Sequence, residues 1–124
     1  MSDITKQSLT ELVENIKDKK LSSTEVTKAF IDRSEKSKEL NSYITEDFTS
    51  ALDKAKKFDQ KPNLDLKLPG IPMAVKDLFC TKDVKTTAGS KILNNFVPTY
   101  ESTVTENIWK EGAILLGKLN CDEF

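Results

Sequence analysis

Two lysines stand where short apolar runs end, and they are the first candidates for chemistry. Lys76 follows the run Ile71 to Val75, and Lys118 follows Ala113 to Leu116 after one glycine. Apolar runs of this length are typical of buried strands, and open α/β sheets bind their ligands at the carboxyl ends of strands. A lysine drawn into a low-dielectric pocket loses its charge readily and can then act as a base. Most lysines at strand ends are simply solvated, however, and neither position nor composition separates the two.

The polar residues near these lysines leave alternatives open. Asp77 could orient neighbouring loops or form an ion pair with a lysine. The segment Thr86 to Ser90 is rich in hydroxyl groups and could cradle an anion, but an ordinary loop is the simpler interpretation. We interpret Cys80 and Cys121 as small buried apolar residues, because neither has a histidine partner that would activate a thiol.

The chain has 124 residues and contains no histidine. This excludes a Ser-His-Asp or Cys-His relay, and a histidine-ligated metal site, from being built within these residues. Any base must be a lysine, a carboxylate, a tyrosine or a thiolate. The formal net charge of −1 gives no electrostatic reason to expect direct binding to nucleic acid or to an anionic membrane.

The expected location is the cytoplasm, with no membrane contact. No apolar run approaches the roughly 20 residues of a membrane-spanning helix. The first residues lack the basic and apolar regions of a signal peptide. Two lone cysteines fit a reducing compartment better than a disulfide framework does.

The first third of the chain is predicted to be helical. Ser8 with Glu11, and Ser22 with Glu25, have the spacing of capping boxes and precede apolar residues at helical intervals. A third helix is predicted to begin at Thr45, where acidic residues occupy the first turn. A short extended segment is expected just before it, around residues 43–44.

The second half is predicted to supply the sheet. Residues 71–75 and 113–116 read as strands, and between them Ser102 should cap a helix that Gly112 closes. Strand, helix and strand in this order suggest a parallel pair with a right-handed crossover. The cap-like residues Asn120 to Glu123 suggest that another helix begins there, and we expect the sequence to be part of a longer domain.

The whole chain resembles one known family. The segment Leu68-Pro-Gly-Ile-Pro-Met-Ala-Val-Lys-Asp77 resembles the segment that carries the catalytic lysine of amidase-signature enzymes. Residues 86–90, 97–104 and 112–124 are similar to the stretches that follow in that family, in the same order, and the helical front is similar too. The resemblance implies that residues 1–124 form the N-terminal portion of a single amidase-signature domain. We divide it into a helical region 1–60, a connector 61–69 and the start of the sheet 70–124.

The resemblance implies a fold and a mechanism. The expected fold class is α/β, with N-terminal helices followed by the start of a mixed β-sheet that belongs to an α/β/α sandwich and is incomplete here. The family's catalytic unit is a lysine, a serine in a cis configuration and a nucleophilic serine. The matching lysine is Lys76 and not Lys118. The two serines lie in a Gly/Ser-rich region after the position of Asn120, and neither Ser90 nor Ser102 matches that motif.

Within the family, the chain is most similar to the glutamine-hydrolysing subunit of the glutamyl-tRNA(Gln)/aspartyl-tRNA(Asn) amidotransferases. This implies glutamine as the amide donor, subunits B and C as partners, and contact with tRNA only through a partner. It implies no cofactor in this chain, with ATP and magnesium held by the partner subunit. Leu119 departs from the family's usual threonine.

The function predicted from the sequence is therefore a part of an ammonia-supplying enzyme of translation. Because the serine partners of Lys76 are absent from this sequence, we expect it to be inactive alone. The alternatives are a non-catalytic interaction module, a degenerate fragment, or a piece of a general amidase that acts on another amide.

Overall fold

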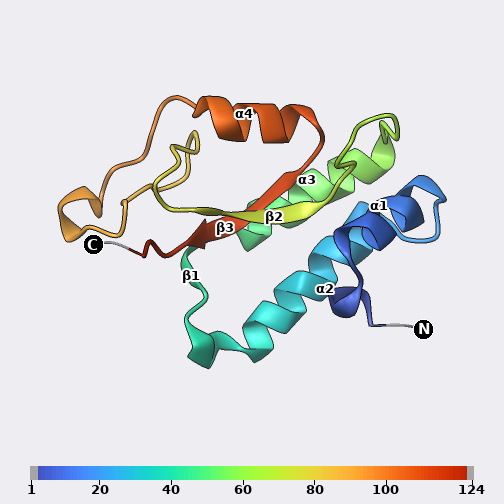
Figure 1. The fold of residues 1–124 in the computed structure, drawn as a ribbon, viewed down its shortest axis with the longest axis horizontal. Coiled ribbons are helices and arrows are strands. Elements are labelled where there is room, and N and C mark those ends of the chain that lie inside the picture. Colours follow the sequence, from blue (N-terminus) through green and yellow to red (C-terminus); the bar gives the residue numbers. More distant parts are fainter. Residues whose placement is uncertain (1–2, 123–124) are drawn as a thin grey trace.

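The computed structural model describes residues 3–122, whose α-helices pack around a small mixed sheet (Figure 1). The helices are α1 (Leu9–Lys17), α2 (Ser23–Lys36), α3 (Phe48–Gln60) and α4 (Thr103–Lys110), and the strands are β1 (Tyr43–Glu46), β2 (Pro72–Lys76) and β3 (Ile114–Leu119). Three short 3-10 helices add to these: η1 (Ile4–Lys6), η2 (Lys38–Leu40) and η3 (Lys91–Leu93). The predicted α/β class, with helices first and a small incomplete mixed sheet after them, is confirmed.

The helix starts follow the capping signals of the sequence. Ser8 and Ser22 both form complete capping boxes with the glutamate three residues later. Ser102 caps α4 by accepting a hydrogen bond from the backbone N–H of Thr105. Gly112 follows the end of α4 with a φ of +97°, a conformation that glycine adopts without strain.

The predicted start of the third helix at Thr45 is wrong. Residues 43–46 form strand β1, and α3 begins at Phe48 after Asp47. The backbone N–H of Asp47 still donates to Leu116 of β3, at 2.8 Å. Pairing with β3 therefore overrides the local preference for a helix in the acidic segment.

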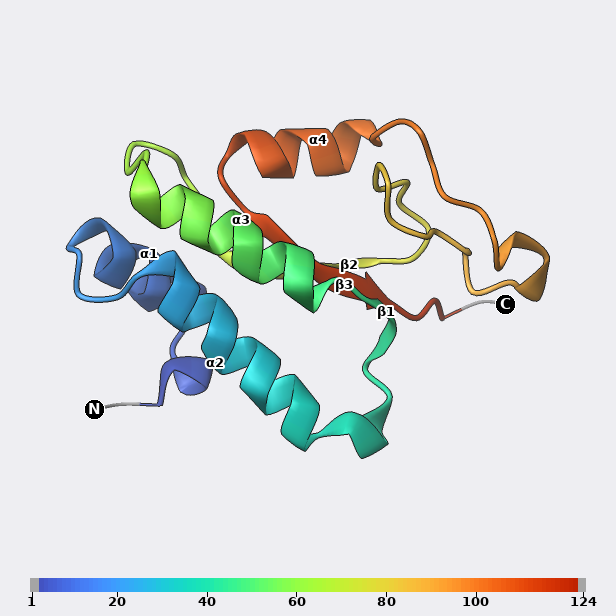
Figure 2. The ribbon, with the colours of Figure 1, turned by 180° about the vertical axis from the view of Figure 1, so that it is seen from behind.

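The sheet has the strand order β1-β3-β2, with β3 in the middle. β2 runs parallel to β3, as predicted, and β1 runs antiparallel to it. In Figures 1 and 2 the helices α1 to α3 lie to one side of β3, while α4 lies on the other. The strand β3 is buried along nearly its whole length, which explains its continuous apolar sequence.

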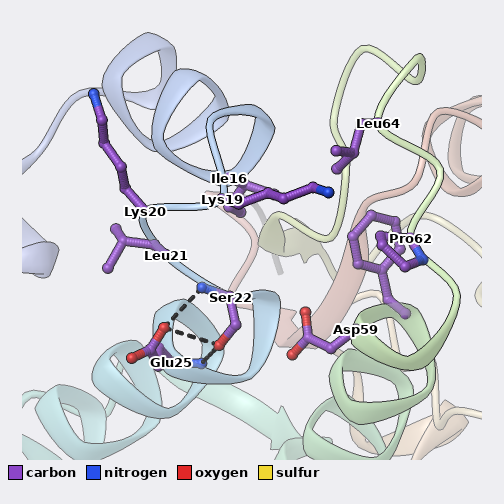
Figure 3. A pocket seen from close by; sticks show the side chains of 10 residues that line it. Ile16, Lys19, Lys20, Leu21, Ser22, Glu25, Asp59, Pro62 and Leu64 are labelled. Atoms are coloured by element: carbon purple, nitrogen blue, oxygen red, sulfur yellow. Dashed lines mark hydrogen bonds between the residues drawn. The ribbon is translucent and has the colours of Figure 1, made fainter.

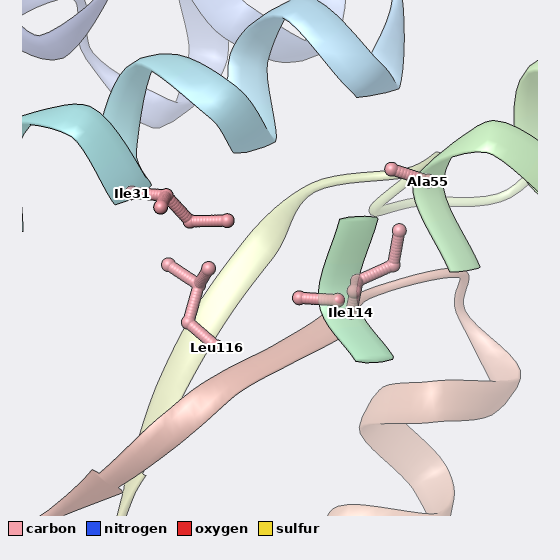
Figure 4. Packing of buried hydrophobic residues seen from close by; sticks show 5 residues of the cluster. Ile31, Ala55, Ile114 and Leu116 are labelled. Atoms are coloured by element: carbon pink, nitrogen blue, oxygen red, sulfur yellow. The ribbon is translucent and has the colours of Figure 1, made fainter. Parts of the chain in front are cut away.

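One hydrophobic cluster joins the sheet to the helices that cover it (Figure 4). Ile114 and Leu116 of β3 pack against Ile31 of α2 and against Ala51 and Ala55 of α3. The two small alanines are fully buried and allow α3 to lie close to the strand. A second cluster, around Leu12, Ile16, Val26 and Ile71, joins α1 and α2 to the start of β2. These two clusters fix the strands whose ends carry Lys76 and Lys118.

A bulge in β3 changes the direction of its last side chains. Met73 pairs with Leu115 and Ala74 pairs with Gly117, so Leu116 is one extra residue on β3. Leu116 packs toward the helices, whereas Lys118, two residues later, reaches the loop on the other side of the sheet. In a regular strand these two residues would share a face, and the bulge reverses that alternation.

A Cβ atom on Gly117 would lie 2.5 Å from the carbonyl oxygen of Thr45, so β1 can approach this point only because the residue is glycine.

Residues 120–122 form no helix, and the remainder of the helix start predicted at Asn120 to Glu123 lies outside the described residues. None of the helices within residues 3–122 combines the length and the apolar character needed to cross a bilayer.

Candidate active site

Lys76 is the last residue of β2, beside Leu119 at the end of β3. Because the two strands are parallel, their carboxyl ends lie at the same edge of the sheet, which is the edge where α/β proteins bind ligands. The side chain of Lys76 is 36% exposed, and its amine forms an ion pair with the carboxylate of Asp122, just after β3. Hydrogen bonding to Lys76 lowers the pKa of Asp122. The amine of Lys76 thus lies at the rim of the sheet, where a solvent-borne molecule can reach it.

Lys118 has the opposite environment. Its side chain is completely buried. The amine donates to the carbonyl oxygen of Phe79 at 2.8 Å and to the hydroxyls of Thr86 and Thr81 at 2.9 Å and 3.0 Å. Burial lowers the pKa of Lys118, and the nearby Asp77 carboxylate opposes this shift. These contacts engage the amine fully, so Lys118 has no open side from which it could take a proton from a substrate.

Asp77 connects the two lysines. It directly follows Lys76, and its Oδ1 atom lies 3.4 Å from the amine of Lys118. Its Oδ2 atom accepts hydrogen bonds from the backbone N–H of Thr87 at 3.1 Å and from the hydroxyl of the same residue. Both roles considered for Asp77 from the sequence are therefore present, because it pairs with a lysine and also orients a loop.

The loop from Thr86 to Ser90 is built around these contacts. The backbone N–H of Ala88 donates to the carbonyl oxygen of Asp77 at 2.9 Å. Ala88 and Gly89 have positive φ angles of 51° and 70°, which turn the chain sharply. The hydroxyl of Thr86 binds Lys118, while that of Thr87 binds Asp77. In this structure both hydroxyls point into the protein, which favours an ordered structural loop over an anion cradle.

The two serines considered in the sequence have local structural roles. Ser90 caps the short helix η3 by accepting from the backbone N–H of Ile92 at 3.2 Å. Ser102 caps α4. Both hydroxyls therefore help to begin helices, as expected of serines that do not match the catalytic motif of the family.

The prediction that both cysteines are buried is wrong. Cys80 and Cys121 are each only partly buried, because both lie in loops near the sheet edge rather than in the strands. The thiol of Cys80 lies 3.5 Å from the hydroxyl of Tyr100, and this contact raises the pKa of Tyr100.

Two of the hollows on the surface of the described residues bear on the candidate residues, and neither is lined by Lys76. One, of about 390 Å³, lies between the α1–α2 connection and the end of α3, and Lys19, Asp59, Pro62 and Leu64 are among its lining residues (Figure 3). Asp59 is already used there, because its carboxylate accepts from the backbone N–H groups that begin α2. The other, of about 270 Å³, lies beside α4. Within residues 3–122, no three histidine, cysteine or acidic side chains are grouped so that they could hold a metal ion.

Comparison with protein families gives a match to the amidase family model over residues 25–124. The chain belongs to the amidase family. All of its 124 residues align with the A subunit of glutamyl-tRNA(Gln) amidotransferase from Pelagibacter ubique (strain HTCC1062), at 82% identity. The protein of the same name from Hyphomonas neptunium (strain ATCC 15444) is 48% identical. In both comparisons this amidase-family chain spans 26% of the relative's length. The resemblance identified from the sequence is confirmed.

Solved structures support the same family. The chain matches the peptide amidase from Stenotrophomonas maltophilia with a TM-score of 0.83 and 27% identity, over 95% of this chain and 25% of that one. It matches fatty acid amide hydrolase with a TM-score of 0.83 and 26% identity, over 96% of this chain and 22% of that one. The helices and the small sheet described above therefore recur within larger amidase-family proteins.

Sequence reasoning identified Lys76 as the candidate base but missed the network around Lys118. Its members are Asp77, Thr81, Thr86, Thr87 and Lys118, all of which are buried. A signal for it did exist, since a lysine within a strand that is otherwise continuously apolar must find polar partners. Which partners it finds depends on the bulge and on the path of the loop, and neither could be read from the residue pattern.

Proposed function

We propose that this chain is the lysine-bearing part of a glutamine-hydrolysing amidotransferase subunit, and that Lys76 is its general base. The observation that carries the proposal is the 82% identity, across the whole chain, to a protein named as the A subunit of glutamyl-tRNA(Gln) amidotransferase. The place of Lys76 at the carboxyl edge of two parallel strands supports its role as a base.

In the proposed reaction, the neutral amine of Lys76 accepts a proton from a bridging serine. The bridging serine in turn takes the proton of a second serine, and the oxygen of this second serine bonds to the amide carbon of glutamine. Collapse of the tetrahedral intermediate breaks the C–N bond, and the proton returns with the leaving nitrogen to give ammonia. Water then releases glutamate from the acyl-serine. Both serines come from the Gly/Ser-rich region of the family, so this chain would contribute the base and its loop.

The released ammonia would be used on a partner. In this proposal subunits B and C complete the enzyme, and a partner subunit binds the misacylated tRNA together with ATP and magnesium. The product would be Gln-tRNA(Gln) or Asn-tRNA(Asn), which places the enzyme in cytoplasmic protein synthesis. This chain would bind no cofactor itself and would contact tRNA only through its partner.

The test is a chimera in which these 124 residues replace the matching quarter of the 82% identical relative, assembled with its partner subunits. We expect Lys76→Ala to reduce glutamine hydrolysis by about 10³-fold or more, because general-base catalysis typically contributes about 10²–10⁴-fold and the lysine also activates a nucleophile. Lys57→Ala, at an exposed position of α3, is the matched control and should retain normal activity. Normal glutamine hydrolysis by Lys76→Ala would refute the assignment of the base.

A second candidate is a general amidase. It is favoured by the likeness to a peptide amidase and to fatty acid amide hydrolase at 26–27% identity. The same chimera separates the two, because an amidotransferase subunit should prefer glutamine over simple aliphatic or aryl amides. If the chimera prefers the simple amides and Lys76→Ala abolishes that activity, Lys76 remains the proposed base and the proposed substrate becomes a simple amide.

A further inference from the structure

The buried pair of Asp77 and Lys118 has no role in the reaction proposed above. Burying two charges is expensive, and well-packed apolar residues often serve stability as well or better. Both side chains are nevertheless fully buried in this structure. The pair also lies immediately next to the proposed base, because Asp77 follows Lys76 in the chain. A role for the pair must therefore be sought in the segments that it holds around Lys76.

Lys118 holds the first part of the loop that follows Lys76. Its amine contacts Phe79, Thr81 and Thr86, and all three of these residues lie within ten positions of Lys76 in the chain. A single ammonium group with its three donors thus gathers a segment that has only an isolated bridge, between Thr81 and Val84, as regular structure. The bulge in β3 lies just before Lys118 and alters the alternation of the side chains that follow it.

Asp77 holds the end of β2 and the later part of the same loop. Its backbone N–H donates to the carbonyl oxygen of Leu119 at 2.8 Å, which continues the pairing of β2 with β3 one residue beyond Lys76. Its side chain binds Thr87, and its carbonyl oxygen accepts from Ala88. These contacts fix the backbone directly after Lys76, on one side to the end of β3 and on the other to the loop.

The pair also sets the charge of the residue that follows Lys76. The Asp77 carboxylate belongs to the next residue in the chain, and the Lys118 cation compensates it. Among the described residues, Cys80 and Glu101 also act on Lys118, and Asp122 contacts Lys76 directly. Without Lys118, an uncompensated carboxylate would favour the protonated form of Lys76, which cannot accept a proton.

We propose that Asp77 and Lys118 are positioning residues of the amidase reaction, which hold Lys76 in place, and that Lys118 compensates the negative charge of Asp77 next to it. The inference rests on the proposed role of Lys76 as a base. Neither residue touches the substrate. Both act through Lys76 and through the loop that follows it.

The experiment measures kcat and KM for glutamine across pH in the assembled chimera, for Lys118→Met, Asp77→Asn and the double variant. Lys118→Met should lower kcat by about 10–100-fold, because small displacements of a catalytic group cost rates of this order, and KM should change by less than about threefold. The acid limb of kcat/KM should move up by about half a pH unit or more in Lys118→Met, and down by a similar amount in Asp77→Asn. In the double variant it should return close to its original position.

The outcomes separate this inference from the function it rests on. A purely structural pair would lower activity in proportion to the folded fraction, with no movement of the acid limb, and that result would overturn the proposal. If Lys118→Met does not fold, Asp77→Asn alone decides, because an unmoved acid limb in that variant also overturns it. If Lys76→Ala retains activity, the proposed function itself fails. If Lys76→Ala is inactive but the limb does not move in either variant, only the positioning role fails.

Discussion

The two lysines at the ends of the parallel strands are alike in sequence context and opposite in environment. Lys76 ends β2 with a side chain that is 36% exposed and an ion pair to an exposed carboxylate. Lys118 lies near the end of β3 with a fully buried side chain, and its amine donates hydrogen bonds to three residues and pairs with the carboxylate of a fourth, Asp77. Both follow apolar runs of similar length.

The difference shows that the position of a lysine along a strand does not determine its burial or its partners. A base must be able to lose its proton and must be reachable, and Lys76 is reachable at the sheet edge. A buried cation with several hydrogen bonds instead ties segments of chain together. The bulge at Leu116 makes this division possible, because it directs Lys118 into the loop and away from the helices.

The largest effect on stability is expected at Lys118. Lys118→Met should reduce the free energy of unfolding by about 3–5 kcal/mol, since it leaves the buried carboxylate of Asp77 without its partner. Lys76→Met should change it by less than about 1 kcal/mol, because its ion pair is at the surface. Urea unfolding of the 124-residue chain, followed by circular dichroism, measures both. Equal losses in the two variants would contradict the contrast between the two sites.

A second prediction concerns the bulge that separates the two sites. Gly117→Ala should cost about 1–3 kcal/mol, a typical penalty for overpacking, because the added Cβ would meet the carbonyl oxygen of Thr45. Ala74→Gly, on the neighbouring strand β2, is a control for glycine content in the sheet. An unchanged unfolding midpoint for Gly117→Ala would show that β1 can move away without loss, and that the close approach is not needed.

The sequence predicted much of this arrangement and failed at particular points. Capping residues such as Ser22 are local signals, so the starts of α1, α2 and α4 could be read directly. The parallel pairing of β2 and β3 followed from the order of the elements. The strand at Thr45 could not be predicted, because its extended form depends on pairing with a strand about 70 residues later in the chain. The partners of Lys118 depend on the same long-range contacts, so the sequence left the two lysines equivalent until a family resemblance distinguished them.

The pH dependence of the free energy of unfolding should also distinguish Lys118 from Lys76. Burial lowers the pKa of Lys118 below the ordinary value of 10.5, so in the alkaline range the unfolded chain binds more protons than the folded one. The free energy of unfolding contributed by Lys118 therefore rises with pH between its folded pKa and about 10.5, with a slope of at most about 1.4 kcal/mol per pH unit. The difference between the wild type and Lys118→Met, from denaturant unfolding at a series of pH values up to about 10.5, isolates this contribution. A difference that stays constant across this range would contradict the lowered pKa.

The smallest expected effect on stability is at Asp122, the partner of Lys76. Asp122→Asn should leave the unfolding midpoint unchanged, because the carboxylate is 82% exposed and screened by solvent. Its effect should appear in catalysis by the assembled chimera instead. The carboxylate favours the protonated form of Lys76, so its removal should move the acid limb of kcat/KM to lower pH. Lys118→Met should move the same limb to higher pH, because it leaves the carboxylate of Asp77 uncompensated. Movement in the same direction in both variants would mean that the carboxylates of Asp77 and Asp122 do not both act on the amine of Lys76.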